Sequence, residues 1–369
     1  MIIQSIDIFP FSIPLKEPFI ISLETITHAH NLLVRIHTDE EALYGWGESS
    51  PFRTINGETQ AGQLALAPLL AKEWIGKDPL DIKARMNDLH KALYGNLSLK
   101  SAFDMALYDI AAKVNGIPLY QFLGGRKNKK LITDQTVSID SAEKMVTQAK
   151  RFIQEGYTHI KVKLGKIPQD DISRIAALRH ALGPEIPLRI DANQGWSVPD
   201  AITVLKGIEQ YDVEHCEQPV HRRDLHGMKS VKDQTNIHIM ADESLNDSYD
   251  VAILIDQDCC HEFNIKFGKS GGILEATTIV NLATQAGIVC QVGCFNESRL
   301  ANTALAHFAY AHDIIHYFDM DSPLMMSTDP IIGGIEYHPG GEVILQDVPG
   351  IGCDVSPDFL KTLDFIRIN

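Results

Sequence analysis

Short apolar segments separated by amphipathic stretches dominate the chain after residue 125. Eight such segments recur at intervals of about 25 residues: TDQTVSI (133–139), THIKVKLG, PLRIDANQG, VEHCEQPV, IHIMADES, EFNIKFGK, IVCQVGCF and IIHYFDMD (314–321). Segments with helical periodicity, such as DISRIAALRHAL and EATTIVNLATQAG, lie between them. Strands that alternate with helices in this way predict a (β/α) barrel, which typically needs about 250 residues. The pattern alone leaves a doubly wound open sheet as the alternative.

The first third of the chain has a different pattern. NLLVRIHTDEEALYGWGES predicts two strands joined by an acidic turn, and SLKSAFDMALYDIAAKVNG predicts a helix that ends at Asn115 and Gly116. We therefore expect an α/β chain with three parts. They are an α+β capping domain at residues 1–125, a (β/α)7β barrel at 126–345, and a C-terminal segment at 346–369 that returns to the capping domain.

Composition and charge refine this picture mainly by exclusion. The formal charge of −15, from 33 basic and 48 acidic residues, argues against nucleic acid or an anionic membrane as a partner. Neither a signal peptide nor a membrane-spanning run is expected from the sequence. The six cysteines form no CxxC pair, so we expect buried free thiols in a cytoplasmic protein.

Three carboxylates fall at the C-terminal ends of consecutive predicted strands, where (β/α) barrels place their functional groups. Asp191, Glu217 and Asp242 would converge there and would repel one another if nothing balanced their charge. A hard divalent cation resolves this repulsion, and all-oxygen ligands favour Mg²⁺. The alternative is that each carboxylate caps a helix or pairs with a surface lysine.

Two lysines end the strands on either side of these carboxylates. Lys163 on the second strand and Lys266 on the sixth would face each other across the mouth of an eight-stranded barrel. Lys161 points to the same strand face as Lys163, so its charge is expected to favour the neutral, basic form of Lys163. Such a geometry suits proton removal next to a carboxylate, with a base on one face of the carbon and an acid on the other.

Five motifs in order make the sequence resemble a known family, and the resemblance covers nearly the whole chain. IKVKLG, DANQGW, CEQPV, MADES and NIKFGKSGGI resemble the enolase superfamily, specifically its muconate-lactonizing-enzyme subgroup. The resemblance implies that Asp191, Glu217 and Asp242 bind Mg²⁺ and that Lys163 and Lys266 are the acid/base pair. The subgroup includes muconate cycloisomerases, o-succinylbenzoate synthases, N-acylamino acid racemases and dipeptide epimerases.

The segment FDMDSPLM distinguishes among these activities. Dipeptide epimerases of the L-Ala-D/L-Glu type carry a DxD near the eighth strand that holds the free ammonium of the substrate, and Asp319 and Asp321 match it. The alternative for Asp321 is a helix N-cap. The resemblance thus implies an isomerase, a dipeptide epimerase, with L-Ala-L-Glu as the first expected substrate. The other activities of the subgroup are the nearest alternative. A Schiff-base aldolase would not need the three carboxylates, and a non-catalytic scaffold would be marked by loss of a lysine or a carboxylate, none of which is lost.

Specificity for the second residue of the dipeptide is expected in two capping-domain loops, ISLETITHAH (21–30) and SSPFRTINGET (49–59). By the resemblance, Glu24 lies about where Ala-Glu epimerases often have a basic residue that meets the glutamate side chain. Arg53 in the second loop would supply the missing cation. If it does not, Glu24 would favour a neutral or cationic second residue.

Three further residues near the expected site have weaker assignments. Glu297, in the seventh-strand loop GCFNESRL, is expected to support the site rather than take part in the chemistry. His28 and His30 lie in the first of these loops and could also contact the substrate, although exposed loop histidines usually have no role. A homo-oligomer is compatible with a barrel of this size, but the sequence identifies no interface.

Overall fold

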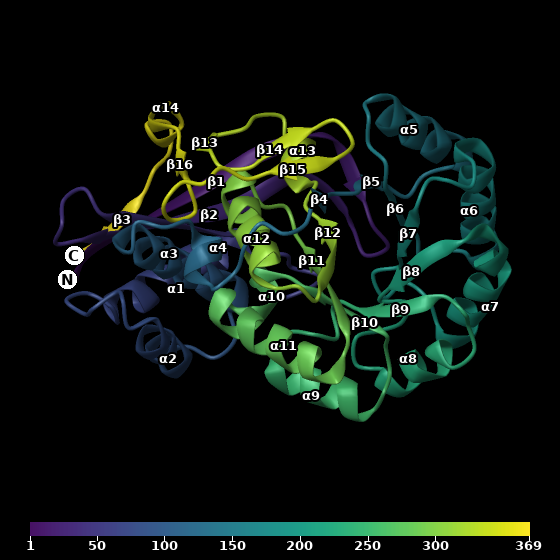
Figure 1. The fold of residues 1–369 in the computed structure, drawn as a ribbon, viewed down its shortest axis with the longest axis horizontal. Coiled ribbons are helices and arrows are strands. Elements are labelled where there is room, and N and C mark those ends of the chain that lie inside the picture. The colour runs from purple at the N-terminus through teal and green to yellow at the C-terminus, as the bar shows by residue number, and fades with distance from the viewer.

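An antiparallel sheet and a group of helices form the N-terminal part of the chain in a computed structural model that describes residues 1–369 (Figure 1). The sheet contains β1 (Ile3–Ile20), β2 (Thr25–Thr38) and β3 (Tyr44–Ser49). Alternate residues of β1 and β2 are apolar and pack on α1 (Gln60–Lys72), α2 (Ile82–Ala92) and α3 (Leu97–Val114). This arrangement confirms the expected α+β capping domain.

The C-terminal strand β17 (Ile366–Ile368) joins the same sheet, so the two ends of the chain lie side by side (Figure 1). Ile366 and Ile368 pair antiparallel with Ile8 and Ile6 of β1. Before it come five short elements: β13 (Ile331–Gly333), β14 (Glu336–His338), β15 (Glu342–Ile344), β16 (Cys353–Val355) and α14 (Pro357–Leu360). The division at residues 125 and 345 stays a proposal.

Eight parallel strands in sequence order form the second sheet: β5 (Gln135–Val137), β6 (Ile160–Lys163), β7 (Leu188–Asp191), β8 (Val213–Glu217), β9 (His238–Ala241), β10 (Glu262–Ile265), β11 (Val289–Gly293) and β12 (Ile315–Asp319). A bridge between Thr133 and Phe318 brings the last strand beside the start of the first and closes the sheet. The structure therefore confirms the (β/α)7β barrel and not the open sheet.

Helices alternate with these strands and surround them (Figure 1). They are α5 (Ala142–Gln154), α6 (Pro168–Leu182), α7 (Val198–Ile208), α8 (Leu225–Lys232), α9 (Ser248–Asp256), α11 (Ile273–Ala286) and α12 (Arg299–Ala311). Shorter elements complete the chain: α4 (Leu119–Phe122), β4 (Leu131–Ile132), a 3₁₀ turn (Glu209–Tyr211), α10 (Phe267–Ser270) and α13 (Ser322–Met325). Ser141, Ser197 and Asp224 cap α5, α7 and α8, which explains why these helices begin where they do.

Two buried carboxylates of the capping domain cap barrel helices and fix the two domains against each other. Glu48 of β3 accepts hydrogen bonds from the backbone nitrogen of Ser298 at 2.8 Å and of Ala301 at 3.3 Å, at the start of α12. Asp104 of α3 accepts from the backbone nitrogen of Ile273 at the start of α11. Because helix N-termini favour negative charge, these contacts hold the capping domain over the mouth of the barrel.

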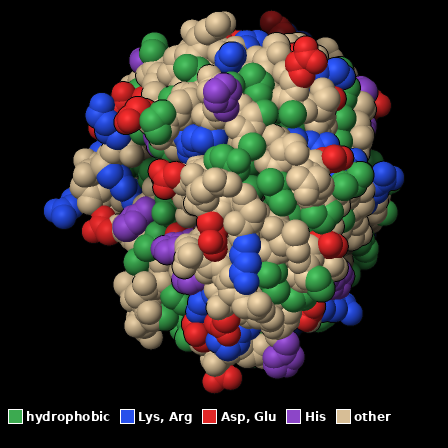
Figure 2. Space-filling view, turned by 90° about the vertical axis from the view of Figure 1, so that its right-hand side faces the viewer, with side chains coloured by type: hydrophobic (Ala, Val, Ile, Leu, Met, Phe, Trp, Pro, Cys, Tyr) green, Lys and Arg blue, Asp and Glu red, His purple; other side chains and the backbone are tan.

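The outer helices of the barrel form a mixed surface. Figure 2 shows the face that carries α5 to α8, on which acidic and basic side chains are interspersed. No helix of the chain combines the length and the apolar character that a membrane crossing requires.

Candidate active site

Three carboxylates converge where the C-terminal ends of the barrel strands meet the capping domain. Asp191 ends β7, Glu217 ends β8, and Asp242 follows β9 directly. All three are fully buried, and one oxygen of each lies within 4.8 Å of the others. In the parallel register Asp191 lies opposite Glu217, and Glu217 lies opposite Met240. The convergence is therefore a direct result of strand register.

The chemistry of these three groups fits a hard divalent cation. They offer only oxygen atoms, and buried negative charges at this distance require a positive partner. Burial and the neighbouring Asp191 both oppose ionisation of Glu217, but the charges of Lys161 and Lys266 outweigh them and lower the pKa of Glu217 to about 2. Lysine charges likewise lower the pKa of Asp191 against the effect of its burial. Asp191 and Glu217 are therefore ionised at neutral pH, as metal ligands must be.

Lys163 and Lys266 lie at the two ends of this carboxylate row. Lys163 Nζ is 2.5 Å from Asp191 Oδ2, and Lys266 Nζ is 2.8 Å from Asp242 Oδ2. Their strands, β6 and β10, are separated by β7, β8 and β9, and both side chains line one chamber. The structure thus brings the two lysines together around the carboxylates in the expected order.

An aromatic ring covers each of the two lysines. Lys163 Nζ lies 5.7 Å from the ring centre of Phe19, and Lys266 Nζ lies 5.0 Å from that of Phe295. Both lysines are almost completely buried. The rings stabilise the ammonium forms by cation–π interaction and separate the amines from solvent.

Lys161 lies deeper in the barrel than Lys163. Its Nζ is 2.7 Å from both Glu217 Oε2 and Asp319 Oδ2, and 3.6 Å from Asp191 Oδ2. Burial opposes the charged form, but the surrounding carboxylates outweigh burial and raise the pKa of Lys161 well above its usual value. Lys161 is thus a fixed positive charge that shares Asp191 with Lys163, and its effect on the basicity of Lys163 stays a prediction.

Asp319 and Asp321 both point into the chamber. Asp319 accepts a hydrogen bond from Lys161, and Asp321 Oδ2 accepts one from the backbone nitrogen of Thr136 at 2.8 Å. Asp321 occupies the N-cap position of α13, as the alternative expected, but its side chain makes no capping hydrogen bond. Burial, together with the charge of Asp319, raises the pKa of Asp321 to about 7.

Asn264, Gln291 and Lys269 were not assigned roles from the sequence. Asn264 Nδ2 donates to Glu217 Oε1 at 2.7 Å, and Gln291 Nε2 is 3.2 Å from Glu217 Oε2. Lys269 Nζ contacts the carboxylate of Asp242 and donates to its backbone carbonyl. Asn264 lies two residues before Lys266 on the same strand face, which is the signal that could have identified it.

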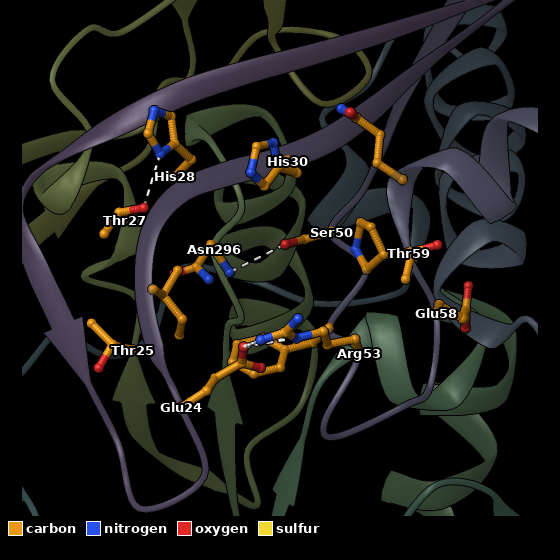
Figure 3. A pocket seen from close by; sticks show the side chains of 14 residues that line it. Glu24, Thr25, Thr27, His28, His30, Ser50, Arg53, Glu58, Thr59 and Asn296 are labelled. Carbon is orange, nitrogen blue, oxygen red and sulfur yellow. Dashed lines mark hydrogen bonds and ion pairs between the residues drawn. The ribbon is translucent and has the colours of Figure 1, made fainter.

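Two loops of the capping domain are joined above the chamber by Glu24 (Figure 3). Glu24 lies between β1 and β2, and Arg53 and Thr54 lie in the β3–α1 loop (50–59). Arg53 Nε donates to Glu24 Oε2 at 3.0 Å, and Thr54 Oγ1 donates to Glu24 Oε1 at 2.6 Å. The Arg53 side chain is 68% exposed, whereas that of Glu24 is 14% exposed. The positive charge of Arg53 is therefore paired with the carboxylate of Glu24.

The β3–α1 loop separates two cavities. The inner chamber has a free volume of about 30 Å³ and contains both lysines, both DxD carboxylates and an apolar group of side chains: Phe19, Ile21, Phe52, Ile55, Phe295 and Met325. The outer cavity has a volume of about 400 Å³, and Glu24, His28, His30 and Arg53 line it (Figure 3). Phe52 and Asn296 line both cavities. The two histidines thus lie outside the chamber.

Glu297 is buried behind the chamber and does not line it. Its carboxylate accepts a hydrogen bond from the backbone nitrogen of Phe295 at 2.5 Å. Burial, reinforced by the nearby Glu48, raises the pKa of Glu297 to about 8. The contact holds the loop that carries Phe295 and Asn296. This is compatible with a role in supporting the site, which stays a prediction.

Addition of Mg²⁺ is expected to stabilise the folded chain, and Glu217→Gln is expected to remove most of this effect. At a Mg²⁺ concentration about 100 times the dissociation constant, the free energy of unfolding should rise by about 2.7 kcal/mol. Thermal denaturation with Mg²⁺ and with EDTA measures the difference, and the exposed Glu185→Gln variant is the control. Identical transitions of the unchanged protein in Mg²⁺ and in EDTA would contradict the metal site.

Comparison with known proteins gives full-length matches. Residues 4–124 match the mandelate racemase/muconate lactonizing enzyme N-terminal domain, and residues 144–359 match the enolase C-terminal domain-like family. The D-Ala-D/L-Ala epimerase of Cytophaga hutchinsonii is 45% identical over 369 residues, 100% of both chains. The L-Ala-D/L-Glu epimerase of Bacillus subtilis is 39% identical over 345 residues, 92% of this chain and 93% of that protein. A crystal structure of a Cytophaga hutchinsonii dipeptide epimerase, complexed with Mg and D-Ala-L-Val, has a TM-score of 0.99 at 45% identity and covers 100% of both chains.

Proposed function

The chain belongs to the mandelate racemase/muconate lactonizing enzyme family of the enolase superfamily, and from this premise we propose that it epimerises an alanyl dipeptide with a small apolar C-terminal residue. It is an isomerase, a Mg²⁺-dependent dipeptide epimerase. The α-carbon of the C-terminal residue changes configuration, because its proton leaves on one face and a proton returns on the other.

Different residues of this chain carry out different parts of the reaction. Lys163 Nζ and Lys266 Nζ remove and return the α-proton from opposite ends of the carboxylate row. Asp319 and Asp321 hold the terminal ammonium and so place the α-carbon between the two amines. Asp191, Glu217 and Asp242 would hold Mg²⁺, which would supply stabilisation of the negative charge that develops on the substrate carboxylate.

The pairing of Arg53 with Glu24 is the observation that supports a small apolar second residue. The two charges neutralise each other at the loop junction, so a glutamate side chain of the substrate would meet no free cation there. Ile21, Phe52, Ile55 and Phe295 instead form an apolar cluster at the chamber. The relative from Cytophaga hutchinsonii is named for Ala-Ala dipeptides, and the crystallised neighbour holds D-Ala-L-Val. We therefore place D-Ala-L-Ala ahead of L-Ala-L-Glu, the substrate expected from the sequence.

A panel of substrates in D₂O tests the proposal. With Mg²⁺ present, D-Ala-L-Ala, L-Ala-L-Ala and D-Ala-L-Val should gain deuterium at the C-terminal α-carbon, as followed by NMR. Their kcat/KM should exceed that of L-Ala-L-Glu by at least about tenfold, a difference of about 1.4 kcal/mol that an unpaired carboxylate in an apolar pocket would readily cause. Faster exchange with L-Ala-L-Glu than with these three dipeptides would favour L-Ala-L-Glu as the substrate, as the sequence led us to expect.

N-acetyl-L-alanine in the same panel separates this function from that of an N-acylamino acid racemase. Such a substrate carries no ammonium and would leave the buried Asp321 without a cationic partner, so its exchange should be much slower. Exchange with the acetylated substrate but with no dipeptide would overturn the dipeptide assignment.

The proposal includes a cytoplasmic location. All six cysteines are free, and five of them are buried, as is usual for proteins of a reducing compartment. Every side chain invoked in the reaction comes from one chain, so a homo-oligomer is compatible with the proposal but not required by it.

A further inference from the structure

Arg222, in the loop between β8 and α8, links the barrel to the middle of the β3–α1 loop. Its Nη2 donates to the backbone carbonyl of Thr54 at 2.9 Å, and its Nη1 contacts the carbonyl of Ile55. On the other side, its Nε and its backbone nitrogen donate to Gln194 Oε1 at 3.1 and 3.0 Å. Gln194 lies three residues after Asp191, so Arg222 connects the loop over the chamber with the loop that follows β7.

The position of Arg222 is itself fixed by the barrel. Ser244 Oγ donates to the Arg222 carbonyl at 2.9 Å, and Gln218 Nε2 donates to Ser244 Oγ at 2.8 Å. Arg222 makes no ion pair, so its guanidinium is committed to neutral oxygen acceptors. A planar guanidinium with several donors suits two adjacent carbonyls, which a lysine ammonium serves less well.

The carbonyls that Arg222 holds belong to the segment that closes the chamber. Phe52 and Ile55 pack with Ile21 and Phe295 in one apolar cluster. Phe52 also lines both the chamber and the outer cavity. The free volume of the chamber, about 30 Å³, holds at most a few water molecules, so a dipeptide enters only if residues that line the chamber move, and this segment contributes Phe52 and Ile55 to that lining.

We propose that Arg222 is a positioning residue that sets the closed position of the β3–α1 loop and so controls passage from the outer cavity to the chamber. The part of this inference that concerns turnover rests on the proposed epimerase function. Glu24 joins the same loop to the β1–β2 connection within the capping domain. Arg222 supplies the corresponding attachment to the barrel, where the reacting groups lie.

Three variants test the role of Arg222: Arg222→Met, Arg222→Lys and, as a matched control, Arg223→Met. Arg223 is the next residue, is exposed, and makes no side-chain hydrogen bond or ion pair. Two measurements need no substrate. The first is hydrogen exchange at the amides of Ile55 and Asn56, which are bonded to the Phe52 carbonyl, and the second is tryptic cleavage after the exposed Arg53.

Arg222→Met is expected to accelerate exchange at these two amides by at least about tenfold and to accelerate cleavage after Arg53. The KM for D-Ala-L-Ala should rise by about tenfold while kcat changes by less than about threefold, because the reacting groups are untouched. Arg222→Lys keeps the charge, and its exchange rates and KM should lie between those of Arg222→Met and those of the unchanged protein. Arg223→Met should behave as the unchanged protein.

Unchanged exchange, cleavage and KM in Arg222→Met would overturn the proposal. Faster exchange with an unchanged KM would also overturn it, because Arg222 would then hold the loop without controlling passage. If Arg222→Met fails to fold, exchange, cleavage and KM are compared between Arg222→Lys and Arg223→Met instead, and the absence of any difference between these two variants would overturn the proposal. If the unchanged protein turns over no dipeptide, the proposed function fails, while exchange and cleavage still show whether Arg222 holds the loop.

Discussion

Replacement of Lys163 by alanine is expected to stop proton exchange from one configuration of the substrate α-carbon and to leave exchange from the other configuration. Lys266→Ala should do the reverse. Lys163 contacts Asp191 and Lys266 contacts Asp242, at opposite ends of the carboxylate row, so each amine reaches only one face of a carbon between them. Net epimerisation needs both faces and should fall by about 10²- to 10⁴-fold in either variant.

Exchange in D₂O, started separately from the two epimers of the dipeptide, measures this expectation by NMR. Lys166→Ala is the matched control, since Lys166 is exposed and lies three residues after Lys163. Because each of these lysines also neutralises a carboxylate that is proposed to bind Mg²⁺, the Mg²⁺ dependence of each variant is measured first, and exchange is compared at saturating Mg²⁺. Loss of exchange from both epimers in both variants would contradict the two-faced arrangement.

The groups that could be predicted from the sequence are those that strand register brings together. A parallel barrel places the last residue of each strand at one rim, so the position of Asp191, Glu217 and Asp242 in the chain already determines that they meet. Lys163 and Lys266 are brought to the same rim by the same regularity. The barrel itself could also be predicted, because the alternation of strands and helices is visible as periodicity within each segment, which is a local property of the sequence.

Contacts between loops could not be predicted in this way. Arg53 and Glu24 were each recognised as candidates, but their pairing depends on how two separate connections of the capping sheet lie over the barrel. Arg222 reaches carbonyls of a loop 167 and 168 positions away in the chain, and backbone carbonyls carry no signal in the sequence. The first contact depends on how two loops of one domain meet and the second on the docking of two domains, and no local periodicity describes either.

Asp321→Asn is expected to impair dipeptide turnover selectively and to change its pH dependence. The carboxylate lines the chamber beside Asp319, and loss of one charged hydrogen bond to the substrate ammonium should raise KM by about 10- to 100-fold. Burial and the charge of Asp319 raise the pKa of Asp321 to about 7. As the pH falls through 7, Asp321 takes up a proton and can no longer pair with the ammonium, so kcat/KM for the dipeptide should fall.

The variant should lose this dependence near pH 7, because an asparagine does not titrate. The fall at higher pH, where the dipeptide ammonium itself loses its proton near pH 8, should remain in both proteins. Initial rates from pH 5.5 to 9 measure both limbs, with the exposed Asp256→Asn variant as control. A wild-type KM in Asp321→Asn would show that the ammonium is held elsewhere. An acidic limb that persists near pH 7 in the variant would assign that titration to another group.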